Sequence, residues 1–127
     1  MTIRRLVGVY DADGSVRGEL AYFVGARLGR THCALCDITH GVVRERAEWK
    51  AYRAGSPVPF DTYHRDDQPE AVRLATHGQF PVVLAETADG YVTLVGPDAL
   101  DACEGSLEAL VGAIERAANV TGLTWPT

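Results

Sequence analysis

The C-terminal third of the chain constrains the fold most strongly, because three elements follow one another there with clear boundaries. The apolar run 80–85 predicts a strand, an Asp-Gly pair at 89–90 is typical of a hairpin turn, and 91–95 predicts the return strand. An amphipathic helix follows, with Asp98 or Ser106 as its expected N-cap. Its apolar stripe consists of Leu107, Leu110, Val111, Ile114 and Ala118. This part of the chain therefore predicts a β-hairpin followed by a helix.

Strands and helices alternate in the rest of the chain. A short apolar run at 6–10 predicts a buried strand, and a second strand is expected at 58–63, where Pro59 indicates a strand start or a sheet edge. Apolar residues at helical spacing and helix boundary signals predict three helices, at 16–28, 42–53 and 68–77. The last of these begins with a capping box from Asp67 to Glu70. Alternation favours parallel strands, and the hairpin adds an antiparallel pair.

This order of elements resembles the thioredoxin-like fold. In that fold the proline before the hairpin is cis and faces the start of the first long helix, and Phe80-Pro81 matches that position. The resemblance covers most of the chain, although an additional helix lies between the first helix and the second strand. It implies an α/β fold in a single domain over 1–127, with a mixed four-stranded sheet flanked by helices. The strands of that sheet are expected to begin near Leu6, Val58, Val82 and Tyr91.

The candidate reactive and metal-binding residues are concentrated at 32–41, which reads His-Cys-Ala-Leu-Cys-Asp-Ile-Thr-His-Gly. Cys33 and Cys36 are two of the three cysteines, and His32 and His40 are two of the four histidines. A Cys-x-x-Cys spacing lets two sulfurs meet on one turn, either in a disulfide or around one metal ion. The flanking histidines favour the thiolate form that both chemistries require.

Three functions remain open for this block. In the first, Cys33 and Cys36 are the catalytic pair of a thioredoxin-like protein that exchanges disulfides with a protein or small-molecule thiol. In the second, the same cysteines bind Zn²⁺ or Cu(I) together with His40, with His32 as a further candidate ligand, because sulfur and imidazole suit these metals. In the third, the block is structural and the chain is a non-catalytic binding module. The thioredoxin-like architecture favours the first function.

The place of the cysteine pair differs from that in the thioredoxin-like fold. There the redox Cys-x-x-Cys opens the first helix, but the corresponding stretch 15–18 reads Ser-Val-Arg-Gly and cannot form a disulfide. Cys33 and Cys36 instead follow the first expected helix, in a stretch that we interpret as a connector. A helix C-terminus carries partial negative charge, which disfavours a thiolate. Thioredoxin chemistry would therefore operate from a new location in this chain.

Four segments resemble a family of small bacterial proteins of uncharacterised activity. They are 9–15, 33–41, 48–50 and 63–66, and the second matches that family's Cys-x-Leu-Cys-x-x-Thr-(His or Tyr)-Gly block. Some of those proteins are labelled GTPases by automated transfer. This chain has no Gly-x-x-x-x-Gly-Lys-(Ser/Thr) loop and its only lysine is Lys50, so we do not expect a GTPase. The resemblance implies the order of the segments and the cysteine block, but no activity.

Composition and charge narrow the expected partners and compartment. The net charge is −5, and residues 80–127 hold seven acidic residues against Arg116 as their one base, which argues against a nucleic-acid partner. The sequence shows neither a bilayer-spanning segment nor a signal peptide, so we expect a cytoplasmic protein without a membrane partner. Its thiols are expected to be reduced at rest. Cys103 is flanked by acids and is expected to be buried rather than reactive.

Overall fold

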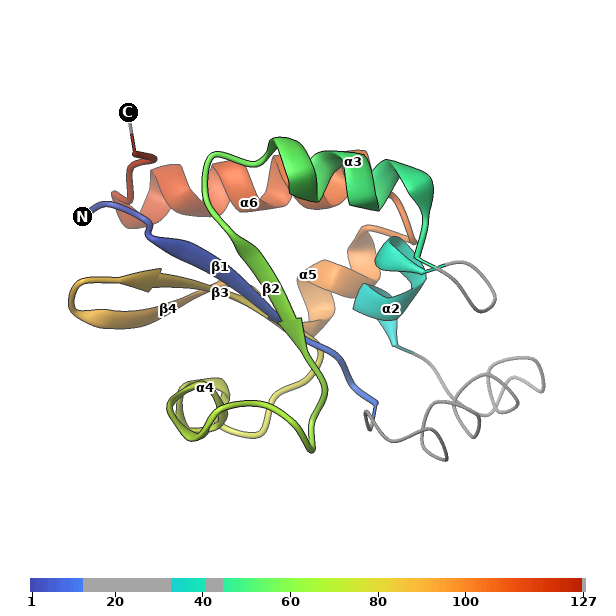
Figure 1. Cartoon of the computed structure of the whole chain (residues 1–127), viewed down its shortest axis with the longest axis horizontal. Coiled ribbons are helices and arrows are strands. Elements are labelled where there is room, and N and C mark those ends of the chain that lie inside the picture. The colour runs from blue at the N-terminus through green and yellow to red at the C-terminus, as the bar shows by residue number, and fades with distance from the viewer. Residues whose placement is uncertain (13–32, 41–44, 127) are drawn as a thin grey trace.

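The computed structural model of the chain describes residues 1–12, 33–40 and 45–126. Four strands and five helices lie within these ranges (Figure 1). In chain order they are β1 (Arg5–Val9), α2 (Ala34–Thr39), α3 (Ala47–Gly55), β2 (Phe60–Tyr63), α4 (Glu70–Thr76), β3 (Val82–Thr87), β4 (Gly90–Val95), α5 (Pro97–Ala102) and α6 (Leu107–Thr121). The helix expected at 16–28 lies outside the described residues, and so does His32.

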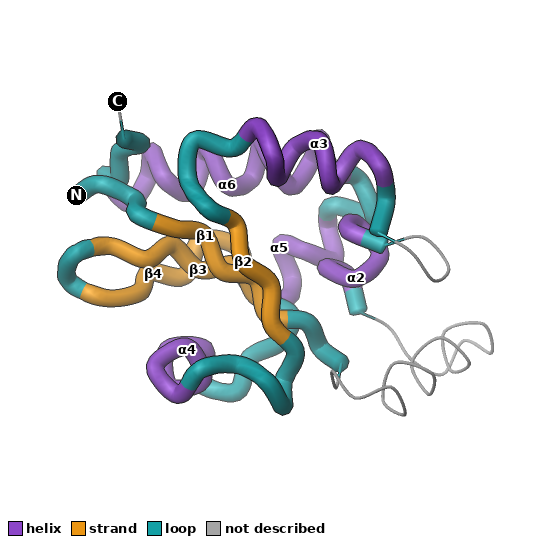
Figure 2. The backbone as a smooth tube through the Cα atoms, in the orientation of Figure 1, coloured by secondary structure: helices purple, strands orange, loops and turns teal. Residues whose placement is uncertain are grey.

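The strands form one mixed sheet in the order β2-β1-β3-β4. β1 is parallel to β2 and antiparallel to β3, and β3 is antiparallel to β4. Helices flank this sheet, so the fold is the expected thioredoxin-like α/β arrangement (Figure 2). The Phe80–Pro81 peptide bond directly before β3 is cis, which confirms the expectation at that position. Pro59 directly precedes β2, an edge strand, where a missing N–H leaves no gap inside the sheet.

Side chains of β1 alternate between two apolar layers, as the two-residue period of a strand requires. Leu6 belongs to the larger core, which contains buried side chains of α2, α3, α5 and α6. Val7 and Val9 belong to a smaller core on the opposite face, together with Val72 of α4. Figure 1 shows this division, with α3 and α6 over one side of the sheet and α4 over the other. The larger core is therefore the layer that contains the helix of the cysteine block.

The C-terminal third folds as the sequence indicates, with one addition. β3 and β4 form the hairpin, and the hydroxyl of Ser106 caps α6 by accepting a hydrogen bond from the N–H of Ala109 over 3.2 Å. Gly122 ends α6 in the left-handed region, with φ of 75°. Asp98 does not cap α6 but lies in α5, a short helix with Pro97 in its first turn. Proline is favoured there because its fixed φ already suits a helix.

Helix α3 begins later than the sequence indicates. The expected start was residue 42, whereas the helix begins at Ala47. His40 and Glu45 form an isolated antiparallel bridge, so the backbone at both residues is extended rather than helical. The N–H of Arg46 then donates to the carbonyl oxygen of Thr39 over 2.8 Å. This pairing holds the start of α3 next to the end of α2.

The capping box expected at the start of α4 is not formed. Pro69 is the N-cap residue of this helix and makes no side-chain hydrogen bond to it. The carboxylate of Asp67 turns back instead, where it accepts the N–H of His64 and lies 3.0 Å from the Nδ1 atom of the same histidine. The prediction was wrong because the turn after β2 has a donor of its own, the backbone N–H of His64, and the Asp67 carboxylate bonds to it.

Candidate functional site

The cysteine block forms the short helix α2, and a disulfide joins Cys33 to Cys36 across its first turn. Cys33 is the N-cap residue and has an extended backbone, with φ of −139° and ψ of 106°. Its Sγ accepts a hydrogen bond from the N–H of Cys36 over 3.3 Å. The two Cα atoms are 5.2 Å apart, a separation that ordinary disulfides have. The step from extended N-cap to helix thus brings the two sulfurs together.

This geometry corrects the interpretation of the block as a connector. Ala34, Leu35 and Ile38 bury their side chains in the larger core, and this burial stabilises a helix that is too short to show a clear period in the sequence. Cys33 lies at the start of α2, where a backbone N–H points at its sulfur and favours a thiolate. The pair is oxidised in this structure, whereas reduced thiols were expected.

The absence of a side chain at Gly8 lets α2 pack closely against the sheet. A Cβ atom at Gly8 would lie 3.1 Å from Cδ2 of Leu35 and 3.4 Å from Cε1 of Phe60. Because the glycine has no side chain, the fully buried Leu35 fills this space and brings α2 close to β1. The distance between the sheet and the helix of the cysteine pair is therefore set by a residue of β1.

A buried hydrogen-bond network ties the last turn of α2 to the end of β1. The hydroxyl oxygens of Tyr10 and Thr39 are 2.9 Å apart, and Oγ1 of Thr39 also lies 2.7 Å from Nδ1 of His40 and 3.3 Å from the carbonyl oxygen of Leu35. Burial raises the pKa of Tyr10, an effect that hydrogen bonds to Thr39 and Thr62 oppose. Sequence reasoning did not select Tyr10 or Thr39, although Thr39 lies within the cysteine block.

Two imidazole rings flank the phenol ring of Tyr10. The ring of His40 is edge-on to it at a centroid distance of 5.6 Å, and the ring of His64 is tilted at 5.3 Å. Nδ1 of His64 lies 3.0 Å from a carboxylate oxygen of Asp67. The network therefore extends to the turn after β2. It joins that turn, the end of β1 and the last turn of α2.

The metal hypothesis requires Cys33, Cys36 and His40 around one ion, with His32 as a further candidate. Within the part of the chain that the structure describes, no three or more His, Cys, Asp or Glu side chains are grouped closely enough to hold a metal ion. His32 lies outside that part. Only the reduced pair would supply the thiolates that Zn²⁺ or Cu(I) needs. The metal site therefore stays a prediction.

Cys103 is buried, as the sequence indicates, and keeps 5% of its surface. It ends α5, and its thiol donates a hydrogen bond to the carbonyl oxygen of Ala99 over 3.4 Å. Burial raises the pKa of this thiol, while the positive charge of Arg116 lowers it. Burial, rather than the neighbouring acids, thus makes Cys103 a poor nucleophile.

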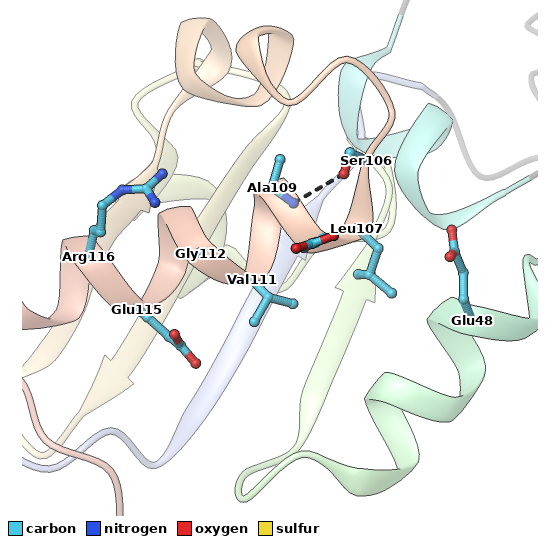
Figure 3. Close-up of a pocket in the computed structure, with 9 residues that line it drawn as sticks. Glu48, Ser106, Leu107, Ala109, Val111, Gly112, Glu115 and Arg116 are labelled. Carbon is cyan, nitrogen blue, oxygen red and sulfur yellow. Dashed lines mark hydrogen bonds between the residues drawn. The ribbon is translucent and has the colours of Figure 1, made fainter.

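A groove of about 830 Å³ runs along α6, and Figure 3 shows the residues that line it. They are Glu48 of α3 together with Ser106, Leu107, Glu108, Ala109, Val111, Gly112, Glu115 and Arg116. The guanidinium of Arg116 lies back over Gly112, where a Cβ atom would come within 3.1 Å of its Nη1. This lining includes no cysteine and no histidine, so the groove is separate from the candidate site.

Comparisons of the chain with protein-family models, with curated proteins and with solved structures give no match. Among the described residues, no helix is both long enough and apolar enough to cross a membrane.

Proposed function

We propose that this chain is a thioredoxin-like thiol–disulfide oxidoreductase in which Cys33 and Cys36 are the redox pair. The observation that carries the proposal is the disulfide across the first turn of α2. The closed loop is only one helical turn, so the bond can open and re-form through a local change. The thioredoxin-like order of strands and helices supports the same function.

The reaction needs a thiol partner, which is either a protein or a small molecule. When a partner dithiol is oxidised, two electrons pass to the Cys33–Cys36 disulfide, and the partner's two thiols become a disulfide. The two protons that the partner loses are balanced by two that the cysteines take up from solvent. In the reverse direction the reduced pair gives two electrons to a partner disulfide. The exchange requires no other redox group.

The surroundings of the pair favour a defined geometry in both redox states. Leu35 is packed over Gly8, and Thr39 is hydrogen-bonded to Tyr10, so both ends of α2 are attached to the sheet independently of the disulfide. After reduction these contacts keep the two sulfurs close to each other. Closeness of two thiols favours re-formation of their disulfide, because little chain entropy is lost.

The proposal is tested by equilibrating the purified protein in dithiothreitol buffers of graded redox potential. After an acid quench and alkylation, mass spectrometry counts the free thiols and locates them. We expect Cys33 and Cys36 to become labelled together and reversibly, and the reduced protein to reduce a protein disulfide substrate. Cys103→Ala is the matched control and should keep both properties. A pair that cannot be reduced reversibly in the native protein would contradict the proposal.

The same experiment distinguishes the structural alternative, which the burial of both cysteines favours. Cys33 has no exposed surface and Cys36 keeps 8%. If the bond is only structural, it should stay closed in native protein at all but the lowest potentials and open only with denaturant. The chain would then be a non-catalytic binding module that is stabilised by this bond.

The metal alternative is tested on reduced protein that has been purified without chelator. Elemental analysis for zinc and copper is combined with alkylation rates in the presence and absence of a chelator. The redox proposal expects labelling that does not depend on the chelator. Slow labelling that a chelator accelerates, with weaker metal binding after His40→Ala, would support a metal site instead.

A further inference from the structure

The two cysteines of the redox pair differ in exposure. Cys33 has no exposed surface, whereas Cys36 keeps 8% of its own. In thiol–disulfide exchange the attacking thiolate must reach one of the two sulfurs directly. We infer that partner thiols attack Cys36 and that Cys33 is the leaving and resolving thiol, an inference that rests on the function proposed above.

The backbone around Cys33 supports the same direction of attack. When a partner thiolate bonds to Sγ of Cys36, the bond between the two cysteines breaks and its electron pair passes to Sγ of Cys33. The N–H of Cys36 already donates a hydrogen bond to that sulfur over 3.3 Å. The donor is therefore in place where the negative charge develops, and charge-assisted hydrogen bonds are the stronger ones.

The second half of the reaction then follows without exposure of Cys33. The partner's second thiolate attacks the partner sulfur of the mixed disulfide, and the electron pair of that bond passes to Cys36. In the reverse direction, the Cys36 thiolate attacks a partner disulfide and one partner thiolate leaves. Cys33, whose Cα lies 5.2 Å from that of Cys36, then attacks the sulfur of Cys36 and releases the other partner thiolate. The buried cysteine reacts only within the protein.

The first test uses the oxidised wild-type protein and the tripeptide thiol glutathione. The reaction is quenched with acid after short times, released thiols are alkylated, and fragmentation mass spectrometry locates the two modifications. We expect glutathione on Cys36 and the alkyl label on Cys33. Glutathione on Cys33 would overturn the assignment while leaving the redox function intact. An absence of adduct at both cysteines, with no reversible reduction, would overturn the proposed function together with this inference.

The second test compares single-thiol variants made in a Cys103→Ala background. Cys33→Ser leaves Cys36 as the only thiol, and Cys36→Ser leaves Cys33; each reacts with an aromatic disulfide that releases a coloured thiolate. We expect native Cys33→Ser to react at least roughly tenfold faster, because access governs the rate. Equal rates in denaturant are the control for intrinsic reactivity. Equal or reversed rates in the native proteins would overturn the inference, and Cys33→Ala repeats the comparison without a new hydroxyl.

Discussion

The hydroxyl groups of Tyr10 and Thr39 lie 2.9 Å apart, and through this contact the end of β1 holds the last turn of the helix that contains the cysteine pair. Thr39 has no exposed surface and Tyr10 keeps only 3% of its own. A buried hydroxyl without a partner loses its hydration and gains nothing in return. The contact therefore fixes the position of α2 as well as contributing to stability.

Replacement of Thr39 by valine should destabilise the protein by about 1 kcal/mol, the usual net value of a hydrogen bond. Valine keeps the shape of threonine but offers no partner to the Tyr10 hydroxyl. Thr39→Ser should retain most of the stability, since it keeps the hydroxyl. The free energies of unfolding are measured by urea titration of the oxidised proteins.

Thr76→Val is the matched control for this change. Thr76 is also buried, with 4% exposure, but its hydroxyl donates to a carbonyl of its own helix, that of Arg73 at 2.9 Å. We expect this variant to lose less stability than Thr39→Val. An equal loss in both variants would show that the hydrogen bond between α2 and the end of β1 contributes no more to stability than a bond within one helix.

A second prediction concerns the close approach of α2 to the sheet at Gly8. Gly8→Ala would place a Cβ atom 3.1 Å from Cδ2 of Leu35, so the leucine or the whole helix must shift. Overpacking of this kind costs about 1–3 kcal/mol. Gly55→Ala is the control, because nothing lies within 4 Å of a Cβ atom there. If Gly8→Ala unfolds at the same urea concentration as the wild type, α2 packs less closely against β1 than the structure shows.

Because α2 packs this closely against Gly8, Leu35→Ala should reduce the loss of stability that Gly8→Ala causes. The shorter side chain removes the atom that the new methyl group meets, at the cost of a cavity in the core. The double variant should therefore be more stable than the sum of the two single losses indicates. The coupling free energy from the double-mutant cycle measures this effect.

The sequence predicts those parts of the molecule that depend on neighbouring residues. The hairpin followed from an Asp-Gly pair, and the meeting of Cys33 with Cys36 followed from their spacing. The contact between Tyr10 and Thr39 was missed because it spans 29 positions and depends on the tertiary fold. Helix α2 has six residues, too few for a helical period to be recognised.

Side chains that compete for one backbone partner also limited the prediction. Asp98 and Ser106 were equally suitable caps for the last helix, and the formation of α5, which contains Asp98, decides for Ser106. Similarly, Asp67 has the right spacing to cap α4 but bonds to His64 instead. Local patterns give the set of possible partners in such cases, whereas the tertiary structure selects one.

A third prediction concerns Arg5, whose guanidinium bridges all four strands on the face of the sheet opposite α2. It donates to Glu86 at 2.7 and 3.1 Å, to Asp61 at 3.0 Å, and to the hydroxyls of Tyr63 and Tyr91 at 3.2 Å. Arg5→Met should destabilise the protein by about 1–2 kcal/mol, because it leaves two carboxylates without their shared cation. Urea titration at low and high salt measures the loss, which should shrink as salt screens the acids.

Two further variants compare the contribution of the Arg5 network to stability with that of an ordinary surface ion pair. Arg5→Lys keeps the charge but has only three donors, so it should recover part of the stability rather than all of it. Arg73→Met removes an exposed pair with Glu70, in which the two atoms are 3.1 Å apart, and should change stability by less than about 0.5 kcal/mol. Full recovery in Arg5→Lys would mean that charge alone, and not the five-donor geometry, matters at this position.

The last prediction follows from the buried phenol of Tyr10. Burial raises the pKa of Tyr10 above its ordinary value of 10.0, so the folded protein keeps this proton at a pH where the unfolded chain loses it. The free energy of unfolding should therefore fall as the pH rises above about 10, by up to about 1.4 kcal/mol per pH unit from this group. Tyr10→Phe cannot ionise and should lose stability less steeply, although Tyr52 and Tyr91 also have a pKa that burial raises and leave part of the slope. Urea titrations from about pH 8 to about pH 11 measure both slopes. Identical slopes for the variant and the wild type would mean that Tyr10 ionises as readily in the folded protein as in the unfolded chain, and that the network beside α2 is open to water.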